Sequence, residues 1–130
     1  MKDVMWIKLS VDTPIDEKIR ALRGFDKEYS WIWICLLTLA GKTNDGGYIY
    51  LSKGVPYDNK QLADYCGTIA AKVDKALDLF ARLEMIEIDK TGIYIINWFG
   101  HQNGDAMEKA REQTKERMKK YRAKKAVTSA

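Results

Sequence analysis

The sequence predicts a mostly helical α+β fold in which two helices, joined by a short turn, are followed by a β-hairpin. Three observations in residues 58–98 lead to this prediction. Gly67 interrupts the chain between two stretches with helical character. In the second stretch, apolar residues recur at the three- and four-residue spacing of one buried helix face. Beyond this stretch, apolar residues recur at every second position, which is typical of strands. The two helices and the strand pair together predict a winged helix-turn-helix with a small antiparallel sheet.

Polar residues with capping chemistry precede both helices of the pair. We expect Asn59 to cap the first helix and Thr68 to cap the second, because short polar side chains accept hydrogen bonds from the free amides of a first helical turn. The second helix is expected to span residues 68–84. Its buried face is expected to comprise Ile69, Val73, Ala76, Leu77, Phe80 and Leu83.

Turn sequences set the limits of three expected strands. Residues 44–47 read Asn-Asp-Gly-Gly, and the β-forming residues 48–51 follow them. Residues 89–92 read Asp-Lys-Thr-Gly and separate the apolar runs 86–88 and 93–96. These two runs form the predicted wing, and the strand at 48–51 would complete a three-stranded sheet.

The N-terminal part is expected to begin with a strand and a helix. Residues 6–9 predict a short strand or extended segment that packs on the core. Pro14 suits the first position of a short helix over residues 14–23, with Thr13 as its cap and Gly24 as its end.

A longer helix is expected from its cap, Asp26, to about Gly41. Its interior is apolar nearly all round, which is typical of a central helix with two neighbours. The helix-turn-helix would cover one face, and the N-terminal segment or a second copy of the chain would cover the other. Trp31 and Trp33 are interpreted as core or interface residues, with a nucleic-acid stacking platform as the alternative.

Composition predicts a single globular domain at residues 1–104 and a tail at residues 105–130. Apolar residues make up 46% of the chain, enough for one modest core. The longest largely apolar run, residues 31–40, is too short to span a bilayer, and no secretory leader opens the chain. Cys35 and Cys66 lack metal-ligand spacing and are expected to be buried free thiols in a reducing cytoplasm.

Positive charge is concentrated near the C-terminus. Residues 108–125 hold nine basic and three acidic side chains, a net charge of +6 in a chain whose total is +4, which leaves −2 for the remainder. Residues 106–126 are good helix formers with sparse apolar positions, so we expect a basic solvated helix or a disordered arm. Such a tail favours a polyanionic partner, most simply nucleic acid.

Several local phrases, in their order along residues 4–103, are similar to the N-terminal domain of phage replisome organiser proteins. The phrases are Trp6-Ile7-Lys8-Leu9, Leu36-Leu37 with Ala40-Gly41-Lys42, Asn44-Asp45-Gly46-Gly47-Tyr48-Ile49, Val55-Pro56-Tyr57, Gln61-Leu62-Ala63, Met85-Ile86-Glu87-Ile88, Ile95-Ile96-Asn97-Trp98 and His101-Gln102. The resemblance implies a winged-helix domain, like that of DnaD-like initiation proteins, that binds repeated double-stranded DNA sites in a phage or prophage replication origin. It also implies a longer protein in the cytoplasm of a bacterial host cell, which recruits host replication proteins through a region expected to lie outside this sequence.

The predicted DNA contacts follow from this fold. Lysines can bond guanine edges or phosphates, and small residues let a recognition helix approach the bases closely. The candidate DNA-binding residues are Lys60 on the first helix; Thr68, Ala70, Ala71, Lys72 and Lys75 on the second; Lys90 and Thr91 in the hairpin turn; and Lys109, Arg111, Lys115, Arg117, Lys119, Lys120 and Arg122 in the tail. The alternatives are an ordinary solvated helix face, an exposed turn and a solubilising tail.

The inventory of side chains argues against an enzyme. The single histidine, His101, has no cysteine or carboxylate at metal-ligand spacing, and the chain contains no phosphate-binding loop or nucleophile–base pattern. We therefore expect no catalysis, no cofactor and no metal. Two other binding functions stay open: a protein-interaction module of a replication complex, including a homo-oligomer, and a transcriptional regulator on the same scaffold.

Overall fold

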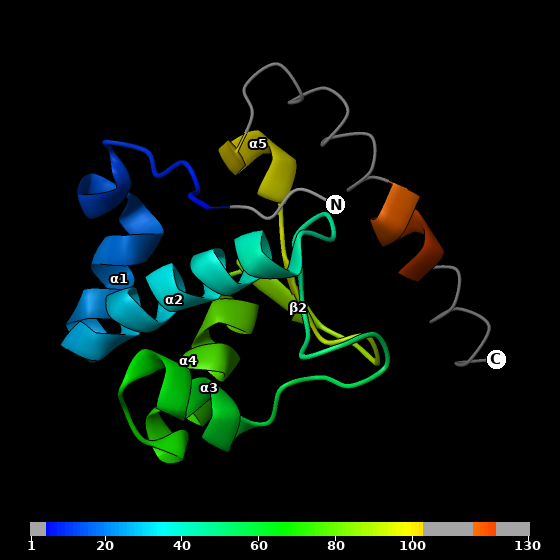
Figure 1. Ribbon diagram of the computed structural model, residues 1–130. Coiled ribbons are helices and arrows are strands. Elements are labelled where there is room, and N and C mark those ends of the chain that lie inside the picture. The colour runs from blue at the N-terminus through cyan, green and yellow to red at the C-terminus, as the bar shows by residue number, and fades with distance from the viewer. Residues whose placement is uncertain (1–4, 103–115, 122–130) are drawn as a thin grey trace, which may run out of the picture. The chain divides into compact units, whose positions relative to one another are not determined.

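The structure, a computed structural model, describes residues 5–102 and 116–121 of the 130-residue chain (Figure 1). The chain divides into two compact units, Met1–Ile96 and Asn97–Ala130. The described part of the first unit contains one 3-10 helix, four α-helices and three strands. The predicted α+β class, mostly helical with a small antiparallel sheet, is confirmed.

The first helical segment is interrupted, unlike the single helix predicted over residues 14–23. A 3-10 helix, η1 (Thr13–Ile15), precedes α1 (Glu17–Phe25). The carboxylate of Asp16 caps α1 by accepting hydrogen bonds from two backbone amides of its first turn, at 3.0 and 3.2 Å. Thr13 is therefore not the cap, because a carboxylate three residues later serves the free amides and the positive end of the helix dipole.

Two other expectations for this region are wrong. Residues 6–9 form no strand, and the Trp6 side chain is 74% exposed instead of packing on the core. Gly24 lies inside α1 rather than ending it. The helix ends where Asp26 takes up the extended backbone conformation with which it caps the next helix.

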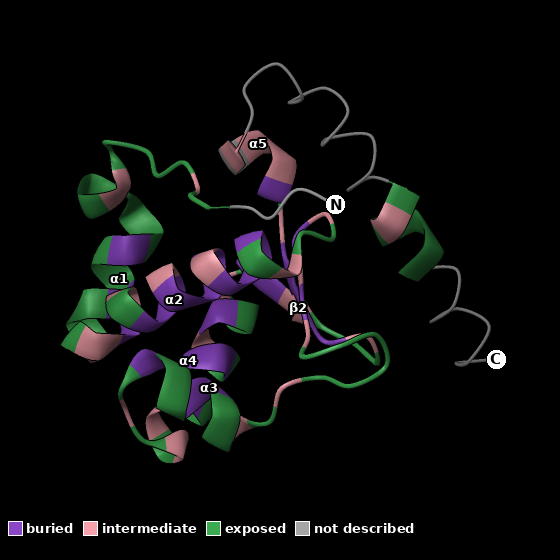
Figure 2. Ribbon diagram, viewed as in Figure 1, coloured by how far each residue is buried: buried purple, intermediate pink, exposed green. Residues whose placement is uncertain are grey.

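The central helix of the first unit is α2 (Lys27–Thr43). Asp26 caps it as predicted, by accepting a hydrogen bond from the Glu28 amide at 2.9 Å. α2 ends two residues later than predicted, where Asn44 adopts the left-handed conformation. Its many buried positions, purple in Figure 2, confirm the prediction of a central apolar helix. They are Tyr29, Ile32, Trp33, Cys35, Leu36, Leu37, Leu39, Ala40 and Gly41.

The predicted helical pair is formed by α3 (Asn59–Cys66) and α4 (Ala70–Arg82). Asp58, rather than Asn59, caps α3. The Asp58 carboxylate accepts from the Gln61 amide at 2.7 Å, and the Gln61 side chain accepts from the Asp58 amide at 3.0 Å. This reciprocal arrangement serves two amides at once, which explains why the helix starts one residue earlier than a cap at Asn59 would allow.

The turn that joins these helices differs from the prediction at its last two residues. Gly67, with φ of 75°, ends α3 as predicted. The N-cap position of α4 is occupied by Ile69, which is 61% exposed, while the Thr68 hydroxyl donates to Glu28 instead of capping α4. The chain enters the helix one residue later than predicted, and this leaves Ile69 outside its buried face. That face consists of Val73, Ala76, Leu77 and Phe80, with Leu83 half-buried beyond it.

Three short strands complete the first unit: β1 (Tyr48–Ile49), β2 (Ile86–Ile88) and β3 (Ile93–Ile95). They form an antiparallel sheet in the order β1–β3–β2, so the predicted hairpin and three-stranded sheet are confirmed. β1 is two residues shorter than predicted. The amide of Leu51 instead bonds to the carbonyl of Val55 at 3.0 Å, which closes a local loop.

The hairpin requires a glycine where it meets β1. Gly92 has φ of 146°, and a Cβ at this position would lie 2.2 Å from the carbonyl oxygen of Ile49. The backbones of β1 and the hairpin turn are therefore too close for any side chain at residue 92.

The two tryptophans of α2 have different environments. Trp33 is buried and packs edge-on against Phe80 of α4, with ring centroids 5.4 Å apart. Trp31 is 54% exposed, and its indole N–H donates to the carbonyl of Cys66 at 2.9 Å. Trp33 is thus confirmed as a core residue, whereas Trp31 lies at the surface beside the end of α3.

In the second unit, the residues that follow the sheet form a short helix. This helix, α5 (Trp98–Gln102), follows Asn97, whose φ is 61°. Its first residue, Trp98, is buried. Residues 116–121 are also helical.

Candidate nucleic-acid interface

Two of the predicted lysines project freely from the helical pair. Lys60 on α3 and Lys75 on α4 are exposed, and neither pairs with a carboxylate within the described residues. Ala71 is also exposed and Ala70 is half-buried. The N-terminal half of α4 therefore combines small side chains, which permit close approach of a partner, with one unpaired positive charge.

Lys72, the other predicted lysine of α4, forms ion pairs with carboxylates of the protein itself. Its ammonium group lies 3.3 Å from Oδ2 of Asp26 and also forms an ion pair with Oε2 of Glu28. Glu28 accepts a further hydrogen bond, of 3.3 Å, from the Thr68 hydroxyl. The start of α4 is therefore tied to the start of α2. The Lys72 side chain is 38% exposed, so the cluster lies at the surface.

This cluster shifts two pKa values in opposite directions. The hydrogen bond to Glu28 raises the pKa of Lys72 above its ordinary value. The hydrogen bond from the Glu28 amide lowers the pKa of Asp26, and Lys72 lowers it further. Two carboxylates and one ammonium give the cluster a net charge of −1 at neutral pH.

The helical pair as a whole is nearly neutral. Residues 58–84 carry four basic side chains and five acidic ones, a net charge of −1. The basic ones are Lys60, Lys72, Lys75 and Arg82, and the acidic ones are Asp58, Asp64, Asp74, Asp78 and Glu84. Any attraction between this pair and a polyanion must therefore come from the local placement of individual lysines rather than from total charge.

The hairpin turn presents one exposed cation. The carboxylate of Asp89 accepts a hydrogen bond from the Thr91 amide at 2.9 Å, which stabilises the turn. Lys90 is exposed at its tip, and Thr91 is half-buried. Both predicted residues are thus in the turn between β2 and β3, and the Lys90 ammonium is the one available for a phosphate.

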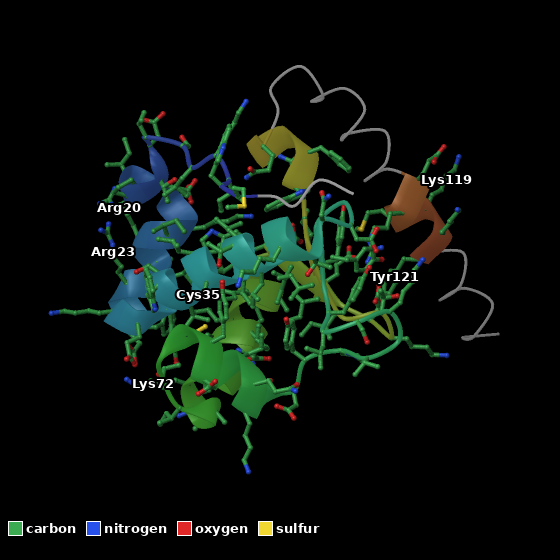
Figure 3. All side chains as sticks on the ribbon, in the orientation of Figure 1. Arg20, Arg23, Cys35, Lys72, Lys119 and Tyr121 are labelled. Atoms are coloured by element: carbon green, nitrogen blue, oxygen red, sulfur yellow. The ribbon has the colours of Figure 1, made fainter. Side chains whose placement is uncertain are left out.

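Part of the predicted basic tail lies within the described residues. Lys119, labelled in Figure 3, is exposed on the helical stretch 116–121. Lys120 is also exposed, and Arg117 is half-buried. The remaining tail residues predicted to bind DNA, Lys109, Arg111, Lys115 and Arg122, lie outside the described residues.

Sequence reasoning missed two groups of charged residues in α1 and at the start of α2. One is the carboxylate pair Asp26 and Glu28, which Lys72 contacts. The other consists of the exposed arginines of α1, Arg20 and Arg23. Their spacing of three residues, on a helix whose apolar positions lie elsewhere, was the available signal.

The two cysteines are free and buried, as predicted. Burial, together with the neighbouring Cys35 thiol, raises the pKa of Cys66 to about 12. Across the residues that the structure covers, no group of three or more histidine, cysteine, aspartate or glutamate residues could hold a metal ion. In the same part of the chain, no helix combines the length and apolar character needed to cross a membrane.

One protein family matches nearly the whole chain: the family model of the N-terminal phage replisome organiser covers residues 6–123. The chain belongs to this family. The family assignment inferred from local phrases is therefore confirmed, and the match extends past residue 103 into the basic tail. Membership of the phage replisome organiser family gives the chain a role in phage replication. Neither the curated proteins nor the solved structures gave a match.

Proposed function

We propose that residues 27–95 of this replisome organiser domain form a winged helix that binds duplex DNA at a phage replication origin. The supporting observation is the element order α2–β1–α3–α4–β2–β3, together with the strand order β1–β3–β2. In helix-turn-helix proteins, the second helix of the pair lies in the major groove with its N-terminal residues toward the base edges. α4 takes this role in our proposal, and the β2–β3 hairpin is the wing.

The exposed residues divide into two kinds of contact. Lys75, beside Ala70 and Ala71, is the candidate for base edges in the groove, because a lysine ammonium can donate to guanine acceptors. Lys60 and Lys90 are candidates for phosphate contacts on either side. Lysines of the basic tail would add further phosphate contacts without adding sequence preference.

Lys72 has a different role in this proposal. Its ion pairs with Asp26 and Glu28 hold the first turn of α4 against α2. We therefore assign it as a positioning residue, which sets the orientation of the recognition helix, rather than as a base contact. Thr68 belongs to the same cluster through Glu28.

The test is a fluorescence-anisotropy titration of the full chain with duplexes that tile the phage DNA around its own gene. An unrelated duplex of equal length is the reference. We expect at least one tile to bind more tightly than the reference, with an affinity that falls as salt rises. Lys75→Ala should weaken binding to that tile and reduce the preference over the reference.

Lys18→Ala is the matched control for Lys75→Ala. Lys18 is exposed near the start of α1, outside the helical pair and the hairpin. Its removal should leave binding unchanged. Failure of the full chain to bind any duplex, or equal binding to all of them, would overturn the proposal of origin recognition.

A protein-binding function is the second candidate, and a specific observation favours it. Two large apolar side chains, Trp31 and Ile69, are exposed around the α3–α4 turn. Exposed apolar surface of this kind is used by many helix-turn-helix scaffolds to hold a protein partner. This function predicts a stable complex with another replication protein that Trp31→Ser or Ile69→Ser disrupts, in a chain that binds no duplex.

A further inference from the structure

α1 presents cations that the proposed contact between α4 and DNA does not use. Arg20 and Arg23 are exposed and lie three residues apart, so they share one side of the helix. The buried positions of α1 are Ile19 and Leu22. Lys27, the first residue of α2, is also exposed, and we refer to these three cations as the basic row.

Neither arginine is neutralised by a carboxylate. No ion pair among the described residues involves Arg20 or Arg23. Nη2 of Arg23 donates to the carbonyl of Pro14 at 2.7 Å, which orients the guanidinium and leaves most of its five N–H donors available. Among the nearby carboxylates, Asp16 caps α1, and Asp26 caps α2 and contacts Lys72. Glu17, three residues before Arg20, forms no ion pair with it in the described part of the chain.

The basic row ends beside the N-terminus of α4. Asp26, three residues after Arg23, lies 3.3 Å from Lys72 in the first turns of α4. In Figure 3, Arg20, Arg23 and Lys72 lie along the same edge of the first unit. A helix in the major groove has a phosphate strand on each side, so cations beside its N-terminus are placed to meet flanking phosphates.

We propose that Arg20 and Arg23, together with Lys27, form a second contact with the duplex, on the phosphate backbone that flanks the groove occupied by α4. This inference rests on the proposed DNA binding by α4 and adds to it a surface outside the helical pair. It supplies the positive charge that the helical pair, with its net charge of −1, lacks. Because phosphates carry no sequence information, the row sets affinity and salt dependence rather than sequence preference.

The experiment measures the slope of log affinity against log salt for the full chain and for the double variant Arg20→Ala/Arg23→Ala. Each lost phosphate contact lowers the magnitude of this slope by about 0.9, so the double variant should lose about 1.8. As salt rises from about 50 to about 200 mM, the wild type should lose roughly twelvefold more affinity than the variant. The ratio of affinities for the preferred and unrelated duplexes should stay at its wild-type value.

Three variants make the result specific to this row. Lys18→Ala removes an exposed cation from α1 two residues before Arg20, on the far side of the helix, and should keep the wild-type slope. Arg20→Lys/Arg23→Lys should keep most of the slope, since the charge remains. Arg20→Glu alone should lower the slope without disturbing the bond between Arg23 and Pro14, which guards against a folding defect in the double variant.

The outcomes separate this inference from the function on which it rests. A wild-type chain that binds none of the duplexes overturns both. A wild-type chain that binds with a preference, while Arg20→Ala/Arg23→Ala and Arg20→Glu keep its salt slope, overturns the contact by α1 alone. An equal loss of slope in Lys18→Ala also overturns it, because the effect would then reflect general charge rather than this side of the helix.

Discussion

The ammonium group of Lys72, near the start of α4, lies 3.3 Å from the Asp26 carboxylate that caps α2. The same carboxylate accepts a hydrogen bond from the Glu28 amide, so it serves the beginnings of two helices. Because α2 is the most buried helix of the first unit, this ion pair holds the start of α4 in a defined position relative to the core. The orientation of the proposed recognition helix therefore depends on a small charge cluster.

Replacing Lys72 with methionine should lower the thermal midpoint of unfolding, because Asp26 and Glu28 would then face each other without a cation. The loss should shrink as salt rises, since ions screen a surface cluster. Circular dichroism melts at low and high salt measure it. Lys75→Met, at an exposed and unpaired position of the same helix, should have little effect on the midpoint. Equal losses in the two variants would contradict a stabilising role of the cluster.

The acid sensitivity of the fold should depend on Asp26. Its pKa in the folded protein lies below the ordinary value of 3.8. A carboxyl group with a lowered pKa contributes stability that is fully present above its unfolded value and is lost as the pH falls through the folded value. Urea unfolding of Asp26→Asn should therefore show lower stability at neutral pH and a weaker decline below about pH 4.

The control for this pH dependence is Asp64→Asn, at an exposed position of α3. It should follow the wild-type curve of unfolding free energy against pH. If the unfolding free energy of Asp26→Asn fell at acidic pH as steeply as that of the wild type, other carboxyl groups would account for the acid sensitivity.

Gly92→Ala should destabilise the fold more than Gly54→Ala. Both glycines have positive φ, which costs an alanine about 1 kcal/mol. The added Cβ at Gly54 meets open space, whereas the one at Gly92 would lie 2.2 Å from the Ile49 carbonyl oxygen. We expect a loss of about 3 kcal/mol for Gly92→Ala and about 1 kcal/mol for Gly54→Ala, measured by urea unfolding. Similar losses would mean that β1 can move away from the hairpin turn at little cost.

The thiol of Cys66 should react slowly in the folded protein. Its pKa of about 12, against an ordinary value of 9.0, reduces the thiolate fraction at pH 8 by about a thousandfold. Iodoacetamide labelling followed by mass spectrometry should modify Cys66 slowly in buffer and rapidly in denaturant. Cys66→Ser controls for labelling of Cys35. Rapid modification of Cys66 under native conditions would contradict its burial.

Much of the fold was predictable because its signals are local. Asp26 caps α2 and Gly67 ends α3, as their chemistry indicated. The apolar spacing from Val73 to Phe80 correctly predicted the buried face of α4. The predictions failed at the ends of elements. Ile69 was predicted to lie on the buried face of α4, but the helix begins one residue later than predicted, so Ile69 precedes it and is exposed.

The candidate site was less predictable, because residues far away in the sequence decide whether a side chain is free to contact a partner molecule. Trp31 and Trp33 are two residues apart in the same apolar helix, yet one is exposed beside α3 and the other packs against Phe80. Lys72 and Lys75 are equally typical of a solvated helix face, yet only Lys72 meets carboxylates.

By itself the amino-acid sequence determined the family, the class of fold and the positions of most helices and strands, since caps, turns and apolar periods act over a few residues. Only the tertiary structure decided which cations remain unpaired. The partner of Lys72, Glu28, lies 44 residues away along the chain, and the charge of one is cancelled by the other only after α2 and α4 have packed together.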